Sequence, residues 1–461
     1  MRLDASAYCT ADKMALGDTP TTALSELADV QQPMIFGKKQ MQGTSSCGVP
    51  LYSSSEMLMQ NPEPVYFMSR RFQPKLTELL GVRKGTILIS RTGTVGLVTI
   101  ITAERDGFLV DDNVMRIVPK REVDRGILFT FLRSPVGQEL LGSLAYGAVQ
   151  NVIKGSQLET IMVPQLSPSA TAEISQKIET SCRLQSEAYL IHKAAISQVL
   201  TANRLPPLTE KGSRPTIHSH SVNAFTRTLL TVYGDLEDRA GIRLDANFYN
   251  RLVYSAIANI KERAFQSRNL GDLSHDVIMG GRFKRNYVEA AQGTPFLSGK
   301  NIIQLRPVDM NHLSNTETEG LSEMLVKHGW ILVTCSGTIG RLCLVWNNFE
   351  DYAASQHILR VLPDKSKVDL GYLYAFLASD YGYQQIIRFR HGAVIDEITD
   401  HQLKKVLVPL PSTKQQEDIG NMVREAYEKR AEALRLEDEA QELMMTEIMG
   451  TKPDKKDRRY V

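Results

Sequence analysis

The sequence has no uninterrupted apolar run of about eighteen residues, the length that a membrane-spanning helix needs. Its beginning also lacks the basic and apolar regions of a secretory signal peptide. The five cysteines are scattered with no CxxC pair, which argues against both a zinc ribbon and a disulfide framework. We therefore expect a cytoplasmic chain in which each cysteine is a small core or half-buried residue.

Signatures of catalysis are also missing. The sequence contains no GxxxxGK[ST] phosphate loop, no HExxH, no GxSxG and no strand-linked GxGxxG. It lacks the Asn-Pro-Pro-aromatic tetrapeptide of amino-methyltransferases, of which residues 61–64 are only a superficial echo. His218 and His220 are expected to be polar linker residues, and the charges at 453–457 to be solvated near a chain terminus. We expect no catalytic residue, metal ligand or cofactor in this chain.

An internal repeat is the strongest feature present. Matching segments recur in the same order at an offset of 241 to 245 residues: RLDA at 2 and 243, ILISRTGTVG at 87 against ILVTCSGTIG at 331, and GAV at 147 and 392. Because this period far exceeds the 20–50 residues of solenoid repeats, it indicates duplication of a whole domain.

Each copy alternates between strand and helix patterns. Residues 86–89 and 97–102 read as a buried hairpin whose turn needs Gly93 and Gly96 for positive φ. Apolar residues at helical spacing predict helices over 128–141 and 373–387. Each copy then closes with a proline-bounded strand, at 161–164 and at 406–409. We expect an α+β fold.

Long helices follow both copies, over about 170–203 and 414–449. They are rich in Glu, Gln, Lys, Arg and Ala and carry a narrow apolar seam, so we expect them to pack against each other as a coiled coil. The Pro-, Ser- and His-rich stretch between the copies reads as a linker.

Basic and hydroxyl side chains remain as candidates for binding a polyanion. The net charge is only +2, so such a surface must be local. Arg and Lys neutralise phosphates, and Ser, Thr, Asn and backbone amides position a duplex. The alternative is that each cation is an ordinary solvated side chain and that the hairpin glycines serve the turn alone. The candidates are Arg70, Arg71, Lys75, Arg91, Thr92 and Thr94 in copy one, and Arg282, Lys284, Arg285, Asn286, Lys300, Asn301, Ser336 and Thr338 in copy two.

The chain resembles the specificity (S) subunit of type I restriction-modification systems and related DNA methyltransferase complexes. The doubled hairpin segments carry the resemblance, together with VPLPSTKQQEDI at 408–419, which is similar to the family's proline-rich start of its conserved helix. Copy one has the weaker VPQLSPS at 163–169, without the Gln-Gln-Glu. Residues 355–357 resemble a second family segment, which adds Gln356 and His357 to the candidate DNA contacts; Asp112 and Asn113 are its poorer counterpart.

The resemblance implies a non-catalytic reader of double-stranded DNA. It implies two tandem target-recognition domains, each β-rich and each followed by a long helix, with the two helices packed as an antiparallel coiled coil. The partners would be methyltransferase (M) subunits, two per chain, which bind S-adenosylmethionine and methylate adenine, with a restriction (R) subunit as an optional addition. The implied division is recognition domain 1–165, helix 166–205, linker 206–240, recognition domain 241–411, helix 412–450 and basic tail 451–461.

Comparison of the copies also suggests where bases are read. Residues 31–47 and 276–292 share almost nothing, whereas the hairpins match well, so we expect base reading in the divergent stretches and backbone contacts in the shared ones. A helix of about 30 residues is roughly 45 Å long, near one-and-a-bit turns of B-DNA, so the helices could set the unread gap between half-sites. Two rival hypotheses stay open: a self-contained DNA-modifying enzyme with an unrecognised site, and a protein-only scaffold.

Overall fold

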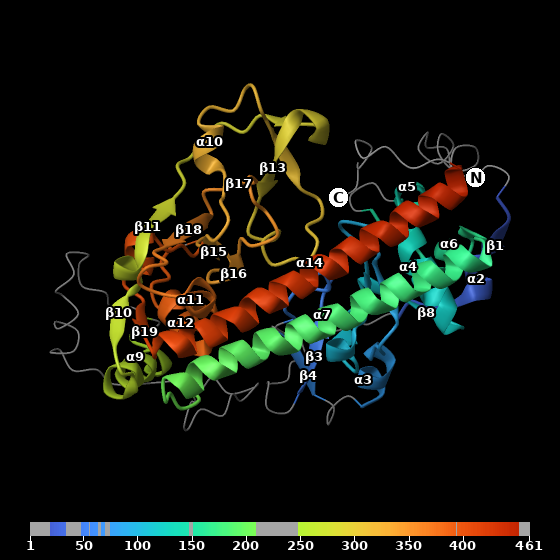
Figure 1. The fold of residues 1–461 in the computed structure, drawn as a ribbon. Coiled ribbons are helices and arrows are strands. Elements are labelled where there is room, and N and C mark those ends of the chain that lie inside the picture. The colour runs from blue at the N-terminus through green and yellow to red at the C-terminus, as the bar shows by residue number, and fades with distance from the viewer. Residues whose placement is uncertain are drawn as a thin grey trace. The chain divides into compact units, whose positions relative to one another are not determined.

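A computed structural model describes residues 19–33, 48–54, 56–62, 66–69, 74–146, 151–208, 248–392 and 394–450 (Figure 1). Among these residues, no helix is both long and apolar enough to cross a membrane. The chain divides into two compact units. Unit 1 comprises Met1–Tyr189, Gln304–Val308 and Lys429–Val461, and unit 2 comprises Leu190–Ile303 and Asp309–Glu428.

Within the described residues of unit 1, three sheets form the strand framework. An antiparallel sheet has the order β2-β8-β5-β6, with bounds Ala28–Gln31, Val114–Pro119, Ile87–Ser90 and Val98–Ile100. A second has the order β4-β3-β7, with bounds Tyr66–Ser69, Gly48–Tyr52 and Leu109–Val110; its β3–β7 pair is parallel. A two-stranded sheet pairs β1 (Thr21–Ala23) with β9 (Met162–Pro164).

Helix α4 (Glu122–Arg133) packs against the four-stranded sheet of unit 1, whereas α3 (Pro74–Leu80) packs against the second sheet. The other short helices in the described part of this unit are α2 (Leu24–Leu27), η2 (Ala103–Arg105), α5 (Pro135–Leu144) and α6 (Gly155–Leu158). Ile87 and Ile89 of β5 share one buried cluster with Leu128 and Phe131 of α4. The alternation of β5 therefore places one set of side chains against the helices.

Unit 2 repeats this framework. Its four-stranded antiparallel sheet has the order β11-β18-β15-β16, with bounds Ser274–Met279, Ile358–Pro363, Ile331–Thr334 and Leu342–Leu344. A second sheet has the order β12-β14-β13-β17, with bounds Tyr287–Val288, Asn311–Ser314, Gly293–Leu297 and Ala353–Ala354. β10 (Ser267–Asn269) pairs with β19 (Leu407–Pro409). Each unit thus joins a four-stranded sheet to a sheet with one parallel pair, β13–β17 in unit 2.

The remaining helices of unit 2 are α9 (Arg251–Arg263), η4 (Leu270–Leu273), η5 (Ala290–Gln292), α10 (Leu321–Met324), α11 (Leu370–Leu377), α12 (Asp380–Ile387) and α13 (Asp400–Leu403). Its main core gathers β15 and β18 with α11: Ile331, Val333 and Val361 lie in the same buried cluster as Phe376. The expected mixed α+β fold class is therefore confirmed.

The single helices predicted over 128–141 and 373–387 are each two helices, and those predictions are wrong. Ser134 ends α4 and caps α5: its hydroxyl donates to Phe131 O at 2.7 Å and accepts from Gly137 N at 3.1 Å. Pro135 favours a helix start because it has no N–H to satisfy. Ser379 does the same in unit 2, donating to Phe376 O at 2.6 Å and accepting from Gly382 N at 3.3 Å.

The two long helices are present as α7 (Pro168–Ala202) and α14 (Thr413–Met449), within two residues of the predicted ends (Figure 1). In unit 1 they run antiparallel, since Lys177 pairs with Glu439 at 2.9 Å and Lys429 pairs with Glu187 at 2.8 Å. In unit 2, Val199 of α7 lies in the same buried cluster as Val423 of α14. Most of the predicted linker and all of the predicted basic tail lie outside the described residues.

Candidate nucleic-acid interface

The hairpin between β15 and β16 presents Ser336 and Thr338 at its turn. Gly337 has φ +73° and Gly340 has φ +85°, conformations that favour glycine. The Thr334 hydroxyl donates to the Thr338 carbonyl and accepts from Arg341 N at 3.0 Å. Thr338 is exposed and Ser336 is half-buried. The turn is therefore built by the backbone and by Thr334, and the Thr338 side chain faces solvent.

Residues 355–357 lie beside that hairpin. Cys335 N donates to His357 O at 2.9 Å, and Ser355 N donates to Leu297 O at 3.0 Å. The Gln356 amide nitrogen lies 3.1 Å from His357 Nε2. Both side chains are half-buried. The segment therefore fixes two predicted contacts, Gln356 and His357, next to a third, Ser336.

The predicted cationic segment, residues 280–287, reaches the same place. Arg285 donates from Nη2 to Gln356 Oε1 at 3.0 Å, and its guanidinium lies over the Phe296 ring at 5.6 Å from the centroid. Arg282 and Lys284 are exposed. Asn286 donates its amide to Glu317 O at 2.9 Å, so this donor is engaged within the protein. The structure thus joins Arg285, Gln356, His357 and Ser336, which are far apart in sequence.

The turn at residues 298–301 corrects one prediction. Asn301 is only 1% exposed, and its side-chain oxygen accepts from Ser298 N at 3.0 Å and from the Ser298 hydroxyl at 2.6 Å. It stabilises the turn, and its prediction as a DNA contact is wrong because burial removes it from any duplex. Lys300 is exposed and pairs with Asp309 at 2.8 Å.

Unit 1 has a related hairpin with fewer free donors. Gly93 has φ +77° and Gly96 has φ +85°. Arg91 N donates to Asn113 O at 2.9 Å, matching the Cys335–His357 bond of unit 2. The Arg91 guanidinium donates to Asp112 O at 3.2 Å, and the Thr92 hydroxyl donates to Asn113 Oδ1 at 2.9 Å. Arg91 and Thr92 are therefore held inside the loop.

The other four candidates of copy one have different outcomes. Thr94 is exposed at the hairpin turn, and Lys75 is exposed near the start of α3. Arg70 and Arg71 lie outside the described residues.

The buried arginines Arg116 and Arg360 were not among the predicted site residues. Arg116 of β8 donates from Nη2 to Leu80 O at 3.1 Å and Val110 O at 2.9 Å, and Arg360 of β18 donates from Nη2 to Ala354 O at 2.7 Å. Burial lowers the pKa of Arg116 to about 10 and also lowers the pKa of Arg360. A Cβ on Gly280 would lie 3.3 Å from Arg360 Nη2, so Arg360 supports the cationic segment from beneath. Arg116 and Arg360 stand at corresponding positions of the two copies, and this match in the sequence could have identified them.

The described cysteines match their expected structural role. Cys335 and Cys343 are buried, and Cys182 is half-buried. Burial raises the pKa of the Cys182 and Cys335 thiols to about 12, which keeps both thiols protonated at neutral pH. Among the described residues, no group of three or more His, Cys, Asp or Glu side chains could hold a metal ion.

A comparison with protein families finds a match over part of the chain that contains these unit 2 residues. Residues 262–432 match the family model described as "Type I restriction modification DNA specificity domain". Residues 262–432 are therefore similar to the DNA specificity domain of type I restriction-modification systems. The resemblance drawn from the sequence motifs is thereby confirmed. The matched residues contain all the described candidate segments of unit 2 and the start of α14.

Solved structures that are similar to this chain include S subunits of type I restriction-modification systems. The type I S subunit from M. genitalium is 12% identical, with 96% of this chain and 100% of that chain covered and a TM-score of 0.36. The HsdS subunit from Thermoanaerobacter tengcongensis is 15% identical, with 95% and 97% covered and a TM-score of 0.28. The type IIG restriction endonuclease BpuSI is 9% identical, with 34% and 26% covered and a TM-score of 0.29. No curated protein matches the chain.

Proposed function

We propose that this chain is the sequence-reading subunit of a type I restriction-modification or related methyltransferase complex. The observation that carries the proposal is the specificity domain at residues 262–432, which contains the joined set Arg285, Gln356, His357 and Ser336. We define this set, with Arg282, Lys284 and Thr338, as the recognition face of unit 2. The chain itself carries out no chemical step in this proposal.

The residues of the recognition face divide into two roles. Arg282 and Lys284 are exposed, so they contact phosphates, which supplies affinity without sequence preference. Arg285 Nη2 donates to Gln356 Oε1 at 3.0 Å. Arginine side chains match the hydrogen-bonding edge of guanine, and glutamine side chains match that of adenine. Pre-organisation by that bond and by the Phe296 ring lowers the ordering cost of binding. These two residues therefore contribute to base reading.

The second half-site is read by unit 1 in this proposal. Its four-stranded sheet has the same antiparallel arrangement, and its hairpin meets residues 112–113 through the bond that corresponds to Cys335–His357. The two units act as tandem target-recognition domains for a bipartite DNA sequence. Because Arg91 and Thr92 are held within their loop, Thr94 and Lys75 are the better described candidates for unit 1.

The long helices act as the spacer between the two recognition domains. α7 has 35 residues and α14 has 37. At a rise of about 1.5 Å per residue each is roughly 50 Å long, against about 34–36 Å for one turn of B-DNA. We propose an antiparallel coiled coil that also docks two M subunits, which bind S-adenosylmethionine and methylate adenine in the cytoplasm. An R subunit would add restriction to the same assembly.

The test combines the chain with the methyltransferase encoded beside it in the genome. DNA recovered from a random-sequence pool by the purified complex should contain one bipartite motif, and methylation should fall on an adenine within it. Recovery of DNA with no sequence preference would contradict the proposal. The chain alone should bind DNA weakly and lose that binding steeply as salt increases.

The same reagents test the two alternatives. Turnover by the chain alone, with DNA and either Mg²⁺ or labelled S-adenosylmethionine, would favour a self-contained enzyme. An unchanged low-salt DNA affinity in Arg282→Ala/Lys284→Ala/Arg285→Ala would favour a protein-only scaffold. A matched control for lost charge is Lys261→Ala/Arg263→Ala/Lys414→Ala, since all three are exposed outside the recognition face.

A further inference from the structure

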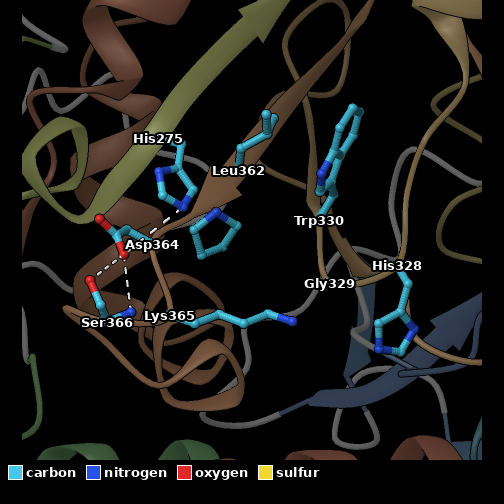
Figure 2. Close-up of a pocket in the computed structure, with 9 residues that line it drawn as sticks. His275, His328, Gly329, Trp330, Leu362, Asp364, Lys365 and Ser366 are labelled. Atoms are coloured by element: carbon cyan, nitrogen blue, oxygen red, sulfur yellow. Dashed lines mark hydrogen bonds and ion pairs between the residues drawn. The ribbon is translucent and has the colours of Figure 1, made fainter.

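A cavity of about 380 Å³ lies in unit 2 at the end of the four-stranded sheet (Figure 2). It is lined by residues that precede β15, that end β18 and that lie in β11, among them Trp330, Pro363 and His275. Because β15 enters the hairpin turn only after Thr334, the cavity and the recognition face lie at opposite ends of this strand. Its volume is within the range of small-molecule sites.

Rings form opposite walls of this cavity. Figure 2 shows Trp330 on one side and His275 on the other, with Leu362 between them in this view. His275 is the extra residue of a β-bulge, because the register of β11 with β18 shifts between Ser274 and Asp276. Bulges redirect a side chain and occur often beside binding sites. Both aromatic rings therefore line the same cavity.

The charge of the cavity favours an anion. The Asp364 carboxylate accepts from Ser366 N at 3.0 Å and from its hydroxyl at 2.6 Å, and pairs with Lys367 at 2.9 Å. These partners hold the pKa of Asp364 well below its usual range, so this negative charge is already compensated. Lys365 extends along Gly329, where a Cβ would lie 3.7 Å from its ammonium nitrogen. Among the described residues, no carboxylate lies within ion-pair distance of Lys365.

We propose that this cavity binds a nucleoside phosphate, with the base between Trp330 and His275 and the phosphate at Lys365. Aromatic side chains stack on any nucleobase, and a lysine ammonium is a common phosphate partner. A sugar phosphate without a base would offer no ring for Trp330 to stack on, and a cation would be repelled by Lys365. The ligand is either a free nucleotide or one unpaired nucleotide of a DNA strand.

Unit 1 supplies an internal comparison. The register of β2 with β8 is continuous, with Asp29 opposite Val118, so no bulge projects a side chain there. Thr86 occupies the position that corresponds to Trp330 in the matched hairpin segments, and it is buried. The framework therefore accommodates a threonine at this position, which makes Trp330→Thr a suitable variant.

Tryptophan fluorescence tests the proposal directly, because Trp330 and Trp346 are the two tryptophans of the sequence. Trp346→Phe leaves Trp330 as the single reporter. The full-length Trp346→Phe protein is titrated with adenosine 5′-monophosphate, adenosine, inorganic phosphate and a five-nucleotide deoxyadenosine strand. We expect saturable quenching by the monophosphate or by the strand, and tighter binding of either than of adenosine. Stronger binding of the monophosphate identifies a free nucleotide as ligand, and stronger binding of the strand identifies an unpaired DNA nucleotide.

Two variants test the assigned contacts. Adding Lys365→Ala should weaken binding of the phosphate-bearing ligand about tenfold, because a charge-assisted contact is lost, and leave adenosine unchanged. Lys414→Ala is the control, since it removes an exposed lysine elsewhere in unit 2. Calorimetry on Trp330→Thr should show lost binding, with circular dichroism checking that the variant is folded.

Three results would overturn the proposal: no saturable quenching by either phosphate-bearing ligand, no effect of Lys365→Ala, or binding of inorganic phosphate as tight as that of the monophosphate. The proposed DNA reading concerns the opposite end of β15, so it would stand or fall separately in the selection experiment.

Discussion

The Ser181 hydroxyl on α7 donates to the Glu437 carboxylate on α14 at 3.0 Å, inside unit 1. Ser181 is fully buried and Glu437 is 6% exposed. Glu437 also pairs with Arg133 of α4 and lies 3.8 Å from Arg306 Nη2. Burial opposes ionisation, but the two arginines outweigh it, so the pKa of Glu437 lies below its usual range. The Glu437 carboxylate therefore links α14 to α7 through Ser181 and to α4 through Arg133, all within unit 1.

Removing that carboxylate should destabilise unit 1. Glu437→Ala leaves Arg133 and Arg306 close together without their shared partner, and losing one member of a buried ion pair costs about 3–5 kcal/mol. The urea midpoint of the unit 1 transition should fall accordingly. Glu439→Ala is the control on the same helix: its partner Lys177 is more accessible, so about 1 kcal/mol or less is expected. Equal losses in the two variants would contradict the role assigned to Glu437.

The Glu437 carboxylate should also make the stability of unit 1 depend on pH in the acid range. Because the folded-state pKa of Glu437 is lowered, its contribution is complete above the unfolded value of about 4.3 and is lost as pH falls through the folded value. The stability difference between the wild type and Glu437→Gln should therefore shrink between about pH 5 and the acid-unfolding midpoint. Urea titrations at successive pH values measure it. A difference that stays constant with pH would show that the carboxylate charge does not stabilise the fold.

The break between α4 and α5 predicts opposite effects for two glycines. A Cβ on Gly137 would lie 1.9 Å from Phe131 O, whereas one on Gly142, in the same helix, would meet nothing within 4 Å. Gly137→Ala should lower the melting temperature of unit 1, because the capped turn must open. Gly142→Ala should raise stability by roughly 0.5–1 kcal/mol through helix propensity. If Gly137→Ala were neutral, the close approach at Ser134 would not constrain the fold.

The sequence predicted the local elements of the fold but not the contacts of Ser134, Asn301 and Glu437. The hairpins and the long helices follow from the repeat and from apolar periodicity, because both are local signals. The break at Ser134 was missed because apolar spacing continues across it, and only the capping bonds interrupt the helix. Asn301 was misplaced because a polar residue in a Gly-rich turn can face either inward or outward. Glu437 reads as one of many helical charges, and its burial depends on Arg133 and Arg306 from distant segments.

For the recognition face, the salt dependence of binding separates phosphate contacts from base contacts. In the complex with M, Arg282→Ala/Lys284→Ala should reduce the slope of log affinity against log salt by about 2 and keep the selected DNA motif. Gln356→Ala should leave the slope unchanged and relax the preference at one base, at a cost of about 1–3 kcal/mol. Filter binding at several salt concentrations and random-pool selection measure the two effects. A changed motif in the double variant would assign Arg282 or Lys284 to base reading.

The proposed spacer predicts a change in the unread gap. Inserting four residues, about one turn, in both α7 and α14 lengthens each helix by roughly 6 Å, close to two base-pair steps of about 3.4 Å. Placed between Tyr189 and Leu190 and between Glu428 and Lys429, the insertions leave the paired residues of each unit on their own sides. The selected DNA motif should keep its two half-sites and gain about two unread bases. Insertion in α7 alone shifts one helix against the other, so it should abolish selective binding. An unchanged gap with the paired insertions would show that the helices do not set the spacing.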